Sequence, residues 1–394
     1  MDVSPYRSHW SLDPGVAFLN HGSYGACPIR VLEEQSRLRA RLESNPVRFL
    51  HRELPDLADQ ARSALGDFLD ANPDDLAFIT NATTGVNTVL QSLRFAAGDE
   101  LLTTDHEYNA SRNALDAVAR RWDAKIVVAR LPWPLPSSQA VVDAVLAQVT
   151  ERTRLCLIDH ISSQTAVVMP VAHLVRALRE RGVETLVDGA HGPGQVSLSL
   201  RQLGAAYYTG NCHKWLCAPK GAGFLYVRRN LQPGIRPLVI SHGYNSKRED
   251  RSRFRLDFDW MGTSDPTPFL CVPKALEVMG GLRPGGWPDV MATNHALALE
   301  ARSLLCQRLG KAPPCPEGLV GSMAVIPLPD GFPTEVTPLG MDPLQERLYN
   351  EHHIEVQITP WPQAPRRHVR VSAQLYNTHA EYQQLGDALG ALLG

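Results

Sequence analysis

The chain has 394 residues, of which 44% are hydrophobic and 20% charged, and its formal net charge at pH 7 is -2. A near-neutral balance without blocks of like charge gives no support for nucleic acid or an anionic membrane as a partner, and no apolar run approaches membrane-spanning length. The seven cysteines include no Cys-x-x-Cys pair, so neither a disulfide framework nor a metal site is predicted, and the cytoplasm is the expected location.

The first two-thirds of the chain alternate short apolar runs with segments of helical periodicity. Seven runs have the character of buried strands: 76–79, 100–103, 125–130, 154–159, 185–188, 206–209 and 223–227. Helical periodicity lies between several of them, at 84–93, 111–121, 141–149 and 171–180. This alternation predicts an α/β fold with a mostly parallel seven-stranded sheet flanked by helices.

After residue 231 the pattern changes. A weakly periodic stretch rich in proline and arginine covers 232–268, and helical periodicity then resumes at 273–279 and 292–309. Further strands are predicted at 323–327, 355–358 and 368–372, and a last helix at 380–393. We therefore expect an N-terminal arm (1–20), a large domain (21–268) and a smaller C-terminal α+β domain (269–394).

One lysine and one carboxylate stand out among the polar residues. Lys214 lies in the sequence Cys-His-Lys-Trp, and Asp188 directly follows two apolar residues of a predicted strand. Carboxyl ends of parallel strands face the ligand crevice in such folds. Pyridoxal phosphate (PLP) needs this pair, because a lysine amine holds it as a Schiff base and an acid keeps its pyridine nitrogen protonated. The alternatives are a solvated surface lysine and an aspartate that caps a turn.

Three further features could complete such a site. His191 could stack on the ring or bond its phenolic oxygen, although a lone histidine is more often structural. Residues 81–85 open a predicted helix, whose N-terminus suits a phosphate, with simple capping as the alternative. Arg370 lies in an alternating strand and could bind a carboxylate through two hydrogen bonds. Alternatively, it is a solvated arginine on an edge strand.

Several motifs in chain order resemble the class V aminotransferases of PLP fold type I, and most closely their isopenicillin N epimerase branch. They are residues 20–23, 49–55, 81–85, 105–108, 187–191, 213–215 and 369–372. The likeness extends from about residue 18 to the C-terminus. It implies the PLP-dependent transferase fold, with a large PLP-binding domain and a small C-terminal domain.

The resemblance also implies a role for each matching position. Lys214 would bind the cofactor covalently, Asp188 would pair with its pyridine nitrogen, and His191 would contact its ring oxygen. The implied phosphate ligands are Ala82, Thr83, Thr84 and His213. Tyr108, or alternatively His106, would lie over the ring. The implied substrate contacts are Arg370, His21 and Arg52. Gly262 and Thr263 would reach the phosphate of a neighbouring subunit, which implies a homodimer with shared active sites.

The reaction is less constrained than the cofactor. Cysteine desulfurases share this scaffold but need a reactive cysteine shortly before the carboxylate-binding arginine, and residues 361–368 contain none. Cys306 and Cys315 lie too far upstream, and Cys212 suits packing better than attack. We expect epimerisation at the α-carbon of an amino acid or aminoacyl peptide. The alternatives are C-S lyase activity on a cysteine conjugate, transamination and, less favoured, a non-catalytic binding role.

The second acid or base group and the substrate side chain are left open by the sequence. Lys214 would move the α-proton, and Tyr108, His106 or His21 would stand on the opposite face. The segment 241–255 contains five basic residues that permit an acidic substrate tail, although a solvated loop is the commoner case: Lys247, Arg248, Arg251, Arg253 and Arg255.

Overall fold

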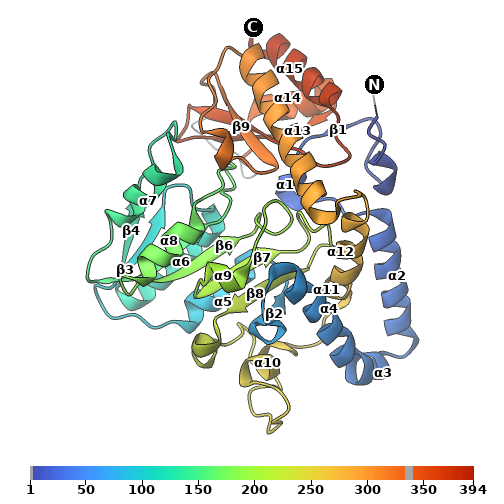
Figure 1. Ribbon diagram of the computed structural model, residues 1–394, viewed down its shortest axis with the longest axis vertical. Helices are drawn as coiled ribbons and strands as arrows, with labels where there is room; N and C mark the ends of the chain where they lie inside the picture. Colours follow the sequence, from blue (N-terminus) through green and yellow to red (C-terminus); the bar gives the residue numbers. More distant parts are fainter. Residues whose placement is uncertain (1–2, 333–339) are drawn as a thin grey trace.

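The computed structural model describes residues 3–332 and 340–394, and its centre is a seven-stranded sheet (Figure 1). The strands are β2 (Leu76–Ile79), β3 (Glu100–Thr104), β4 (Lys125–Ala129), β5 (Thr153–Asp159), β6 (Glu184–Gly189), β7 (Tyr207–Asn211) and β8 (Gly223–Val227). Their order is β2-β8-β7-β6-β5-β3-β4, and β8 is the one strand of the seven that runs opposite to the other six. The predicted mostly parallel sheet is confirmed, with strand ends that differ by a residue or two.

Helices cover both faces of this sheet because its strands bury both faces. Along β5, Leu155 and Leu157 join one hydrophobic cluster with residues of α5 and α6, whereas Cys156 and Ile158 join a second cluster with residues of α7 and α8. The helices are α5 (Ala82–Ser92), α6 (Asn109–Trp122), α7 (Ser138–Leu146), α8 (Val171–Arg179) and the short α9 (Leu200–Leu203). All four helices predicted in this region are therefore present.

A second group of helices lies beside the sheet, and its N-terminal members were not predicted. Its members are α2 (Ile29–Ser44), α3 (Pro46–Arg48), a π-helix (Phe49–Glu53), α4 (Leu54–Leu69), α11 (Thr267–Leu270) and α12 (Val272–Gly280). Helix α2 buries only Val31, Gln35 and Leu38, so its apolar stripe is narrow and its periodicity weak. The weakly periodic stretch 232–268 also contains the helix α10 (Arg253–Phe258).

The C-terminal part forms a smaller layer of sheet and helices, at the top of Figure 1. Its antiparallel sheet has the order β11-β12-β9, with β9 (Met323–Leu328), β11 (Gln357–Pro360) and β12 (Arg367–Ser372). Its helices are α13 (Gly286–Arg308), α14 (Pro343–His352) and α15 (His379–Leu393). The expected smaller C-terminal domain is thus present, while the exact domain boundaries stay a prediction.

The start of the chain pairs with this C-terminal layer. Strand β1 (Ala17–Phe18) runs parallel to β10 (Ile354–Glu355), and the Ser372 N–H donates to the Leu19 carbonyl at 2.8 Å. These contacts place the short helix α1 (His21–Tyr24) beside β12. Four short 3-10 helices complete the elements of the described residues: Arg7–His9, Pro73–Asp75, Arg229–Gly234 and Glu317–Leu319. Among the described residues, no helix combines the length and apolar character that crossing a bilayer demands.

Candidate active site

A cavity of about 340 Å³ opens at the carboxyl ends of β5, β6 and β7, where Asp159, Asp188 and Asn211 reach it. This is the edge at which parallel sheets bind ligands. The cavity brings together seven of the predicted site residues: Ala82, Thr83, Tyr108, Asp188, His191, His213 and Lys214. Residues more than 130 positions apart in the chain thus share one wall because the strands end together.

Lys214 has the properties of a nucleophilic amine. Its Nζ lies 3.1 Å from His191 Nε2. Burial lowers the pKa of Lys214 from 10.5 to about 7, with a further lowering by the charge of Arg370, while Asp188 acts in the opposite direction. A substantial fraction of the amine is therefore unprotonated near neutral pH, as covalent attachment of a carbonyl cofactor requires.

Asp188 is a buried carboxylate that is held in place by two donors. The Ser111 hydroxyl donates to Oδ2 at 2.7 Å, and the Ala190 N–H donates to Oδ1 at 3.1 Å. Burial raises the pKa of Asp188, and no arginine or lysine pairs with it among the described residues. A pyridinium nitrogen would supply the missing cation, so this residue fits PLP.

His191 and Tyr108 complete the walls near Lys214. The Trp215 indole N–H points at His191 Nδ1 (3.4 Å), and burial holds the pKa of His191 well below its usual value, so the ring is neutral. Tyr108 directly precedes α6 and keeps 42% of its surface exposed. Burial of its hydroxyl and the nearby charge of Asp188 raise the pKa of Tyr108, so it is a protonated phenol at neutral pH.

The part of the cavity at the N-terminus of α5 suits a phosphate. Ala82 and Thr83 line it at the N-terminus of α5, where the helix dipole favours an anion. His213 Nδ1 bonds the Ala222 carbonyl at 3.0 Å, so the neutral ring offers only an acceptor at Nε2 and serves an anion when protonated. Thr84 does not line the cavity, because its N–H and hydroxyl contact the capping Asn81 side chain at 2.9 and 3.1 Å.

Arg370 is a buried cation beside the cavity. Its guanidinium donates to the Ser163 carbonyl at 2.6 Å and to the Ser23 hydroxyl at 3.0 Å, and both serines line the cavity. Arg370 is 1% exposed, and within residues 3–332 and 340–394 it forms no ion pair with a carboxylate. A buried arginine without a counter-ion favours an anionic ligand, such as the α-carboxylate that the sequence predicted.

Other predicted residues lie outside the cavity. His21 is fully buried, its Nδ1 bonds the Tyr376 hydroxyl at 2.8 Å, and its Nε2 lies 3.1 Å from the Lys214 carbonyl. His106 bonds Thr165 at 2.8 Å and packs edge-on against Trp361. Three more predicted residues are exposed and do not line the cavity of their own chain: Arg52, Gly262 and Thr263. Their roles stay predictions.

Several cavity residues were missed from the sequence. Asp159 ends β5 and pairs in register with Asp188 of the neighbouring strand. The strand-end argument that selected Asp188 also applies to Asp159, so a signal was present. Further lining residues that carry no strong sequence signal are Ser23, Tyr24, Ser163, Asn211 and Lys220.

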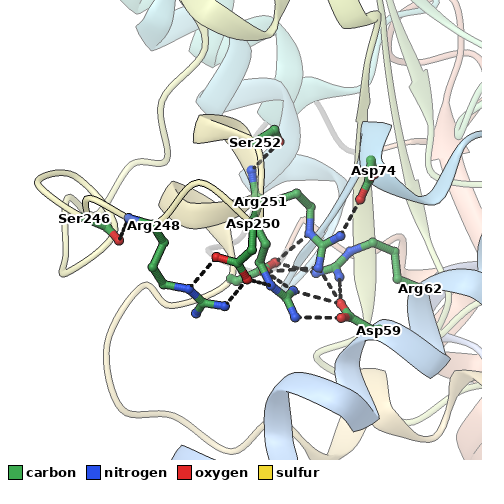
Figure 2. A network of polar contacts seen from close by, with 10 residues as sticks. Asp59, Arg62, Asp74, Ser246, Arg248, Asp250, Arg251 and Ser252 are labelled. Carbon is green, nitrogen blue, oxygen red and sulfur yellow. Dashed lines mark hydrogen bonds and ion pairs between the residues drawn. The ribbon is translucent and has the colours of Figure 1, made fainter.

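Neither a thiol nor the basic segment 241–255 contributes to the cavity. Cys212 is fully buried, and burial raises the pKa of its thiol. In Figure 2, Arg248 pairs with Asp250, and Arg251 contacts Asp59 on α4. Arg255 pairs with Asp59, Asp74 and Asp259, and Arg253 donates to backbone carbonyls. These contacts give no support to the acidic substrate tail that the basic residues of the segment would permit.

Comparison with known proteins agrees with this geometry. The family model described as aminotransferase class-V matches residues 23–262. Isopenicillin N epimerase of Amycolatopsis lactamdurans is 38% identical, over 98% of this chain and 97% of that protein. A probable chloroplastic L-cysteine desulfhydrase of Arabidopsis thaliana is 30% identical, over 97% of this chain and 84% of that protein.

Solved structures show the same fold. A mutant of C-DES with glycine covalently linked to its PLP cofactor has a TM-score of 0.81 at 22% identity, over 98% of this chain and 99% of that one. The apo cysteine desulfurase of Thermococcus onnurineus NA1 also has a TM-score of 0.81, at 18% identity, over 100% and 98% of the two chains. The chain is therefore a PLP-dependent enzyme with fold type I, and it belongs to the class V aminotransferase family.

Proposed function

We propose that this enzyme epimerises the α-carbon of an amino acid or aminoacyl peptide. The observation that carries the proposal is the presence in one cavity of two complementary proton carriers, Lys214 and Tyr108. Lys214 has a pKa of about 7, so it can accept the α-proton, while the raised pKa of Tyr108 keeps the phenol ready to donate one. Bound PLP supplies the electron withdrawal that acidifies the α-carbon.

The remaining cavity residues are assigned to binding. Arg370 would hold the substrate carboxylate, and the Ser163 and Ser23 contacts fix its guanidinium. Asp188 and His191 would hold the ring, and the N-terminus of α5 would hold the phosphate. The isopenicillin N epimerases among the relatives, 36–38% identical, support epimerisation as the outcome.

A C-S lyase is the second candidate, because several relatives are described as L-cysteine desulfhydrases. Lyase activity would use the same Lys214 and Arg370 but would expel a sulfur group from Cβ. We retain it because elimination needs no thiol nucleophile, so the absence of a thiol from the cavity does not count against a lyase. Transamination by the same residues would require a keto-acid acceptor.

Labelling in deuterated water separates these outcomes. We expect holoenzyme incubated with L-amino acids or an aminoadipyl peptide to give D-product labelled at Cα, measured by NMR and chiral chromatography. Label without D-product would reject epimerisation, and release of pyruvate and ammonia from L-cysteine would establish the lyase. Lys214→Ala should abolish every activity, whereas Lys125→Ala, at an exposed lysine of β4, should retain wild-type rates.

We also infer a homodimer in the cytoplasm. Support for the dimer comes from exposed apolar side chains that cluster in one short segment, namely Leu238, Val239, Ile240 and Tyr244. The location is supported by seven cysteines that are all free. Sedimentation should give twice the chain mass, and a monomer with full activity would contradict shared active sites.

A further inference from the structure

Three buried carboxyl groups meet at one wall of the candidate active site, and two of them line its cavity. Glu107 follows β3, Asp159 ends β5, and Asp188 lies in β6, and these three strands are neighbours in the sheet. One oxygen of each group lies within 4.8 Å of one oxygen of each of the others. We call these residues the carboxylate trio. The parallel register of β5 and β6, which sets Asp159 opposite Asp188, enforces their proximity.

The trio has too few cations and donors for three negative charges. Within residues 3–332 and 340–394, none of its members forms an ion pair with lysine or arginine. Asp188 accepts two hydrogen bonds, but Glu107 accepts one, at Oε2 from the Thr103 hydroxyl at 3.1 Å. Glu107 Oε1 and Asp159 Oδ2 are buried and have no partner. Buried acceptors of this kind need a donor.

A proton on one of the carboxyl groups would supply that donor without any further residue. Burial, followed by repulsion from Asp188, raises the pKa of Glu107, while burial and then repulsion from Glu107 raise the pKa of Asp159. The opposing influences are weaker: Thr103 and Arg112 act on Glu107, Lys214 acts on Asp159, and the Tyr108 backbone acts on both. Asp159 lines the cavity and Glu107 does not.

We propose that Glu107 is a neutral acid that donates its proton in a hydrogen bond to Asp159, which stays ionised and faces Lys214. Both would be positioning residues. Glu107 would hold Asp159 in place, and Asp159 would add a second negative charge near the lysine and Asp188. The proposal rests on the cofactor site and holds whether the enzyme is an epimerase or a lyase.

The two amide variants distinguish the acid from the carboxylate. Glu107→Gln replaces a neutral acid by a neutral amide, so the charge near Lys214 does not change. Asp159→Asn removes a negative charge that favours a protonated nitrogen at Lys214. In the holoenzyme, the pH midpoint of the visible cofactor band should stay within about 0.3 unit for Glu107→Gln and fall by about one unit for Asp159→Asn.

Infrared spectroscopy tests the proton directly. A carboxylic acid C=O stretch that shifts in deuterated water should be present in the wild type at neutral pH, lost in Glu107→Gln and retained in Asp159→Asn. Equal midpoint shifts in the two variants would overturn the proposal, because both groups would then be ionised. An unchanged midpoint in Asp159→Asn, or no acid band in the wild-type protein, would also overturn it. The wild-type spectrum remains decisive if a variant fails to fold, and none of these readouts depends on turnover.

Discussion

Carboxylates gather in two regions of this protein, and the regions treat charge in opposite ways. In the first region, Asp59, Asp74 and Asp259 contact Arg62, Arg251 and Arg255, so anions and cations are equal in number. Figure 2 labels four of these residues: Asp59, Arg62, Asp74 and Arg251. The carboxylate trio has no arginine or lysine ion pair within the described part of the chain. We call the first group the Arg–Asp network. Uncompensated buried charge marks the functional site, and compensated charge marks structure.

The two regions also differ in their contact with solvent. In the Arg–Asp network, the side chains of Asp59 and Asp74 are 42% and 55% exposed, whereas all members of the trio are buried. Water therefore screens part of the network, and the low dielectric of the interior strengthens repulsion in the trio. The network ties α10 and the segment before it to α4. The trio, by contrast, is expected to lower stability, because its carboxyl groups repel one another, and to attract a cation.

The largest expected effect is that of Asp188→Asn, which should reduce activity without reducing thermal stability. Asp188→Asn should lower activity by on the order of 100- to 1000-fold, because it removes the acidic partner of the cofactor ring. The apoprotein should be at least as thermally stable as the wild type, since the repulsion between Asp188 and Asp159 is gone while an acceptor oxygen remains. Initial rates and thermal midpoints check both outcomes. A variant with wild-type rates would contradict our assignment of Asp188, and Asp250→Ala is the matched exposed control.

This contrast also shows what the sequence could and could not predict. Strand periodicity and local motifs predicted the seven-stranded sheet, and the structure brings Lys214, Asp188, His191 and Tyr108 into one cavity. The trio could not be predicted, because it depends on the order of β3, β5 and β6 in the sheet. The Arg–Asp network joins residues 59–74 to residues 251–259, and arginine composition alone does not predict such contacts.

Two further features mark the limit of local signals. Helix α2 carries too narrow an apolar stripe to be recognised, although it packs against α11 and α12. His21 belongs to a motif that resembles the family, yet the structure buries both of its ring nitrogens in hydrogen bonds. A motif predicts that a residue matters but not which way its side chain points.

Arg255→Ala should have the largest effect on stability in the Arg–Asp network. The variant leaves Asp59, Asp74 and Asp259 short of a cation, so we expect destabilisation of about 2 kcal/mol with activity retained. Arg248→Ala breaks one exposed pair with Asp250 and should leave the thermal midpoint unchanged. Equal midpoints for the two variants would show that the network does not hold the segment to α4.

The pH dependence of stability should differ in sign between the regions. The raised pKa values of the trio mean that the folded apoprotein keeps protons which the unfolded chain releases above about pH 4, so this contribution falls as pH rises. The slope is at most about 1.4 kcal/mol per pH unit for each group. Asp188→Asn should therefore gain stability relative to wild type as pH rises. A difference that stays constant from pH 5 to pH 8 would contradict the raised pKa values.

The opposite sign holds for Asp59. Burial acts to raise the pKa of Asp59, but hydrogen bonds and charges from Arg251 and Arg255 lower it overall. Its contribution is present above the pKa of the unfolded chain and is lost as pH falls through the folded value. Asp59→Asn should thus lose stability relative to wild type as pH rises from about 2 to 5, which thermal unfolding across that range would detect.

Salt should produce the smallest effect and the sharpest contrast. At about 1 M NaCl the screening length is roughly 3 Å, which weakens the solvent-exposed pairs of the Arg–Asp network but reaches buried charges much less. The stability difference between wild type and Arg255→Ala should shrink, while the difference between wild type and Asp188→Asn should stay constant. If both differences shrank together, water would reach the trio in solution. A shared Glu107 proton would then be unnecessary, because solvent could supply the donors that Glu107 Oε1 and Asp159 Oδ2 lack.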